Sequence, residues 1–212
     1  AGLLALAEAF PGTPLRIDPN ANWTVETSLR IVRQLQGVLE YYEDPAPGLE
    51  GMAEVARACD VPLATNMVVT DFAEFRRNVE MGCPVKIVLS DHHYWGGLRA
   101  TQRLSTLCRT FDLGLSMHSN SHLGISLAAM THLCASVPLL TYACDTHYPW
   151  QDEEVIAGGR LRFEQGSLPV PSGPGLGVTL DREALARLHD NYLHCGIRHR
   201  DDLAQMRKYD HA

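Results

Sequence analysis

Residues 116–126, SMHSNSHLGIS, decide the fold of this chain. An apolar run at 113–115 precedes them, and a pattern typical of a helix, 125–133, follows. The histidine, asparagine and serine side chains between these segments therefore lie where a strand passes into a helix. Polar groups at the carboxyl end of a strand in an α/β protein point into the mouth of the fold. We expect this stretch to belong to a functional site and not to the core.

The composition argues against several classes of protein. The chain has 212 residues, 45% of them hydrophobic, which is ordinary for a globular domain. Its net charge of −7 and its lack of a basic run argue against nucleic acid and membrane surfaces as partners. No apolar run approaches the roughly 20 residues of a membrane span. The six scattered cysteines form no Cys-x-x-Cys pair, so we expect reduced, mostly buried thiols in a cytoplasmic protein.

One design repeats along the chain. Predicted strands at 15–18, 38–42, 61–65, 85–89, 113–115 and 139–144 each end in a polar side chain or are followed by one within three residues. These polar residues are Asp18, Glu43, Asn66, Asp91, His118 and His147. They recur every 23 to 29 residues, which is the length of one strand and one helix. Such spacing predicts parallel strands with right-handed helical crossovers, as in a (β/α)-barrel or a doubly wound sheet.

Local signals indicate where the helices begin and end. Thr24 and Asp71 are suited to cap helices that follow them, and Gly82 lies where the second of these helices should stop. Further helices are expected at 1–10, 49–58, 98–111, 125–133 and 181–194, the last after a Gly- and Pro-rich segment at 166–177. The order of elements is therefore the alternation of strand and helix that an α/β fold requires.

Of the two α/β folds, we prefer the barrel. No Gly-x-Gly-x-x-Gly opens any expected helix, as it would in a dinucleotide-binding sheet. A barrel also places all the strand ends around one mouth. Six units are readable where a complete barrel has eight, so residues 1–212 are expected to form a partial barrel domain. Its strands would be the third to the eighth, followed by a helical C-terminal tail, and the first two strands would precede Ala1.

Three of the strand ends supply oxygen ligands for a metal. Asp18, Glu43 and Asn66 follow three successive strands and include no sulfur donor. Mg²⁺ prefers oxygen, needs few protein ligands and keeps positions for water or substrate. The alternative is that each side chain only caps a strand end by bonding nearby backbone amides. Three such residues on successive strands favour the metal site.

The next two strand ends suggest a catalytic base. An imidazole such as His118 is oriented and made more basic when a carboxylate such as Asp91 accepts its second N–H. Other histidines are assigned smaller roles. His92 and His93 could line the mouth, His122 and His132 are expected to be structural, and His189, His194, His199 and His211 are expected at the surface.

The assembled residues resemble the C-terminal barrel of the enolase superfamily, and most of all its glucarate dehydratase group. The matching segments are RIDPNANW (16–23), YEDP (42–45), ATNM (64–67), LSD (89–91), MHSN (117–120), DTH (145–147), PGLGV (174–178) and RDD (200–202). They extend over nearly the whole chain in family order. The asparagine in place of an acidic third ligand, together with the histidine-containing segments, is specific to this group.

The resemblance implies a Mg²⁺-dependent hydro-lyase, a carbon–oxygen lyase that dehydrates an acid sugar. Asp18, Glu43 and Asn66 would hold Mg²⁺, which would stabilise an enediolate as a Lewis acid. His118, oriented by Asp91, would remove the proton α to the substrate carboxylate. In its protonated form His118 would then help to expel the β-hydroxyl. By the same resemblance, Asn120, His147 and Arg200 would contact the polar groups of the substrate, with Arg200 suited to a distal carboxylate.

Two parts of the family pattern are absent from the sequence. The Lys-x-Lys of the second barrel strand and the N-terminal capping domain would both precede Ala1. We therefore expect a complementary chain or N-terminal half, and an oligomeric protein. The other hypotheses are a non-catalytic barrel fragment and a metal hydrolase with histidine-bound Zn²⁺. The hydrolase is weak because His-x-His and His-Glu-x-x-His spacings do not occur.

Overall fold

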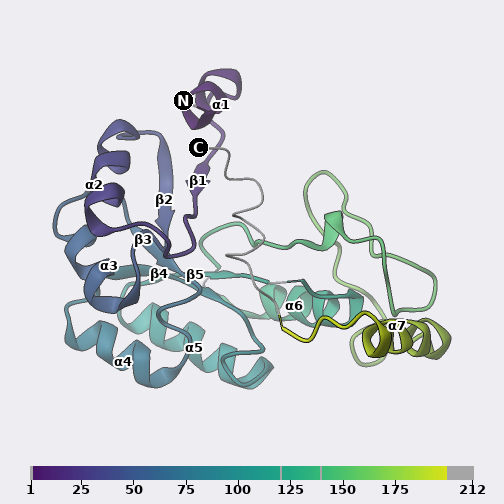
Figure 1. The fold of residues 1–212 in the computed structure, drawn as a ribbon. Helices are drawn as coiled ribbons and strands as arrows, with labels where there is room; N and C mark the ends of the chain where they lie inside the picture. Colours follow the sequence, from purple (N-terminus) through teal and green to yellow (C-terminus); the bar gives the residue numbers. More distant parts are fainter. Residues whose placement is uncertain (1, 120, 139, 200–212) are drawn as a thin grey trace.

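The computed structural model describes residues 2–119, 121–138 and 140–199. Its centre is a five-stranded parallel sheet in which neighbouring strands follow one another in the sequence, in the order β1-β2-β3-β4-β5. The sheet curls into half of a barrel, with the helices on its outer side (Figure 1). The strands are β1 (Leu15–Ile17), β2 (Leu39–Glu43), β3 (Leu63–Thr65), β4 (Val85–Ser90) and β5 (Gly114–Met117). The expected partial (β/α)-barrel is confirmed.

Two helices begin where the capping signals of the sequence indicate. The Thr24 side chain accepts a hydrogen bond from the Thr27 N–H at 3.2 Å, and Asp71 caps the Ala73 and Glu74 N–H groups at 2.8 and 2.9 Å. Gly82 has a φ of 82°, the left-handed conformation that ends a helix. The helices are α1 (Gly2–Ala9), α2 (Val25–Gln34), α3 (Gly48–Ala56), α4 (Phe72–Glu80), α5 (Leu98–Thr110), α6 (Gly124–Ser136), the 3₁₀ helix η1 (Tyr148–Trp150) and α7 (Arg182–His194).

The two faces of the sheet belong to different packing layers because successive strand side chains point to opposite sides. Tyr42 on β2 and Leu115 on β5 face the helices and are fully buried. Tyr41, the neighbour of Tyr42, lies on the concave face in a smaller cluster with Ile87 and Tyr142. The same alternation places Glu43 beside Tyr41 on the concave side. The strand period therefore directs the site residues into the half-barrel.

The expectation of a sixth strand at 139–144 is wrong. Within the described part of this segment, no residue is assigned to a strand. The segment lies along β5 all the same, because Thr141 N–H donates to the Leu115 carbonyl at 3.1 Å and Asp145 N–H to the Met117 carbonyl at 2.9 Å. The Leu115 N–H, however, donates to the Thr141 hydroxyl at 3.1 Å. A side chain thus replaces the backbone partner that a regular ladder would need.

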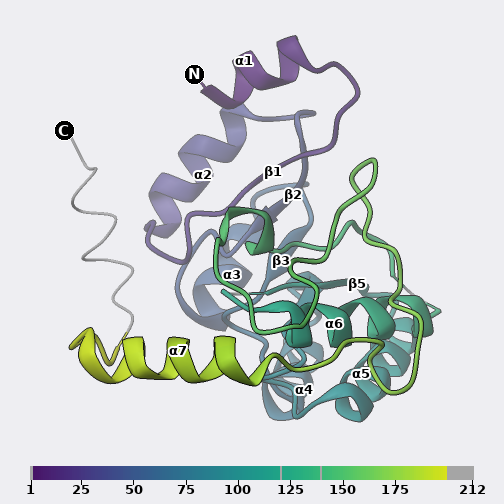
Figure 2. The same cartoon turned by 90° about the vertical axis from the view of Figure 1, so that its right-hand side faces the viewer.

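The remaining segments lie at the margins of the half-barrel. Between η1 and α7 the chain is irregular, with an isolated antiparallel bridge between Ile156 and Leu180. Helix α7 extends away from the half-barrel (Figure 2). Among the described residues of α1 none is buried, and Leu4, Leu6 and Phe10 are exposed around it. None of the described helices has the length and apolar character needed to cross a membrane.

Candidate active site

A cavity of about 620 Å³ opens at the carboxyl ends of the strands. Four of the six predicted strand-end residues line it, namely Asp18, Asn66, His118 and His147. Asp145 lines it as well. The curled parallel sheet explains this convergence, because all of its strands end at the same rim. The structure therefore gathers residues that lie up to 129 positions apart in the sequence.

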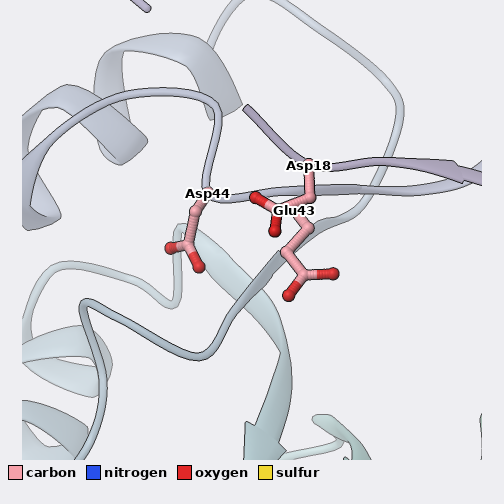
Figure 3. A group of neighbouring side chains, drawn as sticks. All are labelled: Asp18, Glu43 and Asp44. Atoms are coloured by element: carbon pink, nitrogen blue, oxygen red, sulfur yellow. The ribbon is translucent and has the colours of Figure 1, made fainter. Parts of the chain in front are cut away.

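Carboxylates meet at one side of this rim. Asp18 follows β1, while Glu43 ends β2 and Asp44 follows it (Figure 3). One oxygen of each residue lies within 4.8 Å of the others. Glu43 is 5% exposed, and burial, followed by the charge of Asp18, raises its pKa to about 8. Burial likewise raises the pKa of Asp44 to about 6 and that of Asp18.

This cluster fits a hard divalent cation. Its donors are oxygens, and the negative charges of Asp18 and Glu43 oppose each other in a partly dehydrated place. A cation would offset both the burial and the repulsion that raise the pKa values of these carboxyl groups. Some of the strand-end capping interpretation is also correct, since Asp18 Oδ1 accepts the Asn20 N–H at 2.7 Å. One oxygen of Asp18 is therefore used locally, and its other oxygen stays available.

Asn66 connects the carboxylates to the histidine. Its Nδ2 donates to Glu43 Oε1 at 2.7 Å and lies 3.0 Å from Nε2 of His118. Both hydrogens of the amide can thus be used, and this fixes where the amide oxygen points. The structure brings the three predicted metal ligands to one place, although Asn66 contacts Glu43 through its nitrogen.

The sequence did not single out Asp44, which is fully buried. Its Oδ2 accepts the Asn66 N–H at 3.0 Å, and its Oδ1 accepts a hydrogen bond from the Thr65 hydroxyl. Strand alternation would turn Asp44 away from the neighbouring Glu43. Its φ of 34° breaks the alternation and turns the carboxylate toward the end of β3. In the sequence, Asp44 is marked only by the Glu-Asp-Pro motif, and that motif does not indicate that Asp44 has a different role from Glu43.

His118 and Asp91 form the predicted pair. His118 Nδ1 lies 2.7 Å from Asp91 Oδ2, and Asp91 is 2% exposed. Since a carboxylate only accepts, Nδ1–H donates and Nε2 faces the cavity. Nε2 is also 3.8 Å from Asp145 Oδ2. Burial lowers the pKa of His118, but the hydrogen bond and charge of Asp91, with the charges of Asp145 and Glu43, raise it by more.

The substrate contacts implied by the resemblance are placed only in part. His147 lines the cavity and packs against the Trp150 ring at 5.4 Å between centroids. Asn120 and Arg200 lie outside the described residues. Asp145 is a cavity residue that the sequence reasoning quoted within its Asp-Thr-His motif but gave no role.

A second cavity of about 630 Å³ adjoins the first, with Tyr94 lining both. His92, His93 and His122 line it. His122 Nε2 lies 2.8 Å from the Thr146 hydroxyl, and the structural role expected for His122 stays a prediction. Burial lowers the pKa of both His92 and His122 to about 4, so both are neutral at pH 7.

The match to a family model identifies the class of protein. The model described as "Enolase C-terminal domain-like" matches residues 2–184, and the chain belongs to this family. Among curated relatives, a probable glucarate dehydratase of Streptomyces coelicolor is 60% identical over 99% of this chain and 49% of its own length. An L-talarate/galactarate dehydratase of Salmonella typhimurium is 28% identical over 85% of this chain and 42% of its own length.

Solved structures agree with this assignment. An enolase of Pseudomonas fluorescens with bound magnesium, potassium and tartrate has a TM-score of 0.91 and 63% identity, over 98% of this chain and 49% of that one. An enolase of Gibberella zeae with magnesium, formate and sulfate has a TM-score of 0.91 and 56% identity over the same shares. The chain thus spans about half the length of the relatives it matches.

Proposed function

We propose that this chain provides the metal site and the base of a Mg²⁺-dependent acid-sugar dehydratase. The observation that supports this most is that His118 and Asp18 line one cavity, where the Asn66 amide lies between Nε2 of His118 and the carboxylate of Glu43. The 60% identical relative is named as a probable glucarate dehydratase, and two structural neighbours contain magnesium. The substrate class would be sugar carboxylates, glucarate-like diacids among them.

In the proposed chemistry, metal binding, proton abstraction and loss of the β-hydroxyl follow one another. Asp18, Glu43 and Asn66 would hold Mg²⁺, which when bound supplies Lewis-acid stabilisation for charge that develops on the substrate carboxylate. His118 Nε2 takes the proton from the carbon α to that carboxylate, while Asp91 holds the imidazole through Nδ1. The bond from the β-carbon to its hydroxyl then breaks. His118 returns the proton to the departing oxygen, which leaves as water.

The rest of the cavity would bind the substrate. We assign Asn120, His147 and Arg200 to its hydroxyl groups and its distal carboxylate, as the resemblance implies. His147 already lines the cavity. An arginine beside a carboxylate gives a charge-assisted, bidentate contact, which explains how an acidic protein can bind an anion.

We also propose that the site is completed by a second polypeptide or by an N-terminal half. This partner would supply the first two barrel strands, the Lys-x-Lys and the capping domain. In the described part of the chain, β1 pairs with β2 alone, so the other side of β1 presents unpaired backbone groups. The half-length coverage of the relatives supports the same proposal. The alternative is a barrel fragment without activity of its own.

A reconstitution experiment separates these hypotheses. The chain is assayed for keto-acid formation from six-carbon sugar diacids, alone and after coexpression with a half that contains Lys-x-Lys. We expect activity in the combined protein with Mg²⁺, none after chelation, and no preference for Zn²⁺. Inactivity of the combined protein with every diacid would favour the non-catalytic fragment. Zn²⁺-dependent hydrolysis would contradict the proposed dehydratase.

The proposed location remains the cytoplasm. The sequence argument for this location is that the six cysteines are scattered and form no Cys-x-x-Cys pair.

A further inference from the structure

Two of the free cysteines face each other across packed elements. Cys134 lies on α6, and Cys144 lies in the segment beside β5 that leads to Asp145. Their sulfurs are 3.3 Å apart, and both side chains are half-buried. A disulfide has sulfurs about 2.05 Å apart, so an approach of roughly 1.3 Å would allow the bond to form. Neither cysteine has a role in the proposed dehydration.

The surroundings of Cys144 favour its thiolate. The hydrogen bond from the Cys134 thiol is the largest influence that lowers the pKa of Cys144, and it outweighs burial. The charge of Arg16 acts in the same direction. The pKa of Cys134 is raised by the same contact. A half-buried cysteine whose thiolate is favoured by a neighbouring thiol is the arrangement found in redox-active pairs.

We propose that Cys134 and Cys144 are a redox modification site, in which a hydroperoxide converts the two thiols into an intrachain disulfide. The Cys144 thiolate attacks the peroxide oxygen, the O–O bond breaks, and Cys144 becomes a sulfenic acid with release of water or alcohol. The Cys134 sulfur then displaces the hydroxyl from Cys144, which leaves as a second water. The two sulfurs together lose two electrons and two protons, and the peroxide is reduced by the same two electrons.

The disulfide would act on the cavity through the backbone next to Cys144. Asp145 follows it directly, is held to β5 by its bond to the Met117 carbonyl, and has its carboxylate 3.8 Å from His118 Nε2. The bond would tie this segment to α6 and close a short loop. Formation of the disulfide does not depend on the proposed function. Only an effect on turnover would depend on it.

The digestion pattern makes the test direct. No Lys or Arg occurs between Arg109 and Arg160, so trypsin releases one peptide that contains both cysteines and no other. After treatment with one equivalent of hydrogen peroxide, we expect this peptide to lose about 2 Da, the mass of two hydrogens, and to regain it with a reducing agent. Cys195→Ser is the matched control, because Cys195 is exposed and lies in a different tryptic peptide, and the loss should persist in it.

Single variants identify the attacking sulfur. In Cys134→Ser, Cys144 should accumulate as a sulfenic acid that a dimedone-type reagent traps. In Cys144→Ser, Cys134 should stay unmodified. In the wild type, oxidation should raise Tm by roughly 5 °C and shift the NMR signals of His118.

The proposal is overturned if the peptide keeps its mass under peroxide, or if Cys144→Ser leaves the reactivity of Cys134 unchanged. Unmoved His118 signals in the oxidised protein would overturn the effect on the cavity. These measurements need no catalytic activity, so failure of the proposed function would not be mistaken for failure of the disulfide.

Discussion

Replacement of the hydroxyl of Thr65 tests how the end of β3 is held in place. Thr65 is fully buried; its hydroxyl donates to Asp44 and accepts the N–H groups of Met67 and Val68 at 3.1 and 2.8 Å. Asp44 in turn accepts the Asn66 N–H at 3.0 Å. Thr65→Val removes this hydroxyl with almost no change of shape, whereas Thr65→Ser keeps the hydroxyl and removes a methyl group.

The structure sets the expected magnitudes. In Thr65→Val, one oxygen of the buried Asp44 carboxylate loses its partner, and so do two amides, of which that of the exposed Met67 can turn to water. Each buried polar group left without a partner costs about 1–3 kcal/mol, so the carboxylate and one amide together cost about 2–6 kcal/mol. Thr65→Ser should cost only about 1 kcal/mol, the value of a buried methyl group.

Urea unfolding of both variants measures this difference, and calorimetric titration measures Mg²⁺ binding. We expect Thr65→Val to be less stable than Thr65→Ser by about 1 kcal/mol or more. Its Mg²⁺ affinity should also fall at least about tenfold, because Asn66 loses its support. Equal stabilities of the two variants would refute the reasoning about the hydroxyl. An unchanged Mg²⁺ affinity in Thr65→Val would refute the link from Asp44 to Asn66.

Three further predictions concern the catalytic base, the pH dependence of stability, and the hydrogen bonds that hold the start of β4. In the complete protein, Asp91→Asn should lower turnover about 10²- to 10⁴-fold and leave Mg²⁺ affinity nearly unchanged, because only the orientation of His118 is lost; steady-state kinetics and calorimetry check this. Burial depresses the pKa of His122 to about 4, so the neutral imidazole makes its full contribution to the free energy of unfolding above pH 6.5. That contribution is lost as pH falls from 6.5 through 4, because the unfolded chain binds the proton more readily than the folded one. His122→Gln should therefore flatten the dependence of the urea midpoint on pH between 6.5 and 4. Asn78→Ala removes the fully buried amide that bonds both backbone groups of Val85, at 3.0 and 3.1 Å, and should cost about 2–4 kcal/mol in urea unfolding, with Asn78→Asp as the partial control.

The sequence was sufficient for features that local patterns specify. Thr24 and Asp71 cap the helices that follow them, and the apolar runs before Asp18, Glu43 and Asn66 are parallel strands. These features follow from side-chain chemistry and period, which a single segment contains in full. The convergence of the strand ends could be predicted too, because parallel strands with helical crossovers all end at one edge.

Features that depend on contacts between distant segments could not be predicted in this way. The run at 139–144 has the composition of a strand, but the Thr141 hydroxyl takes the Leu115 N–H and prevents a regular ladder. The role of Asp44 depends on a positive φ and on groups of the next strand. The contact between Cys134 and Cys144 depends on how α6 packs beside the segment that follows it.

The central claim is that His118 removes the proton α to a carboxylate held beside Asp18, Glu43 and Asn66. Exchange of that proton in deuterated water, followed by proton NMR on the complete protein with an acid sugar, tests the claim most directly. The account predicts exchange that requires Mg²⁺ and that falls by about 10³-fold or more in His118→Asn. Mg²⁺ affinity should stay within about twofold in that variant, and His189→Asn on the exposed part of α7 should behave as wild type. Exchange at the wild-type rate in His118→Asn would contradict the account.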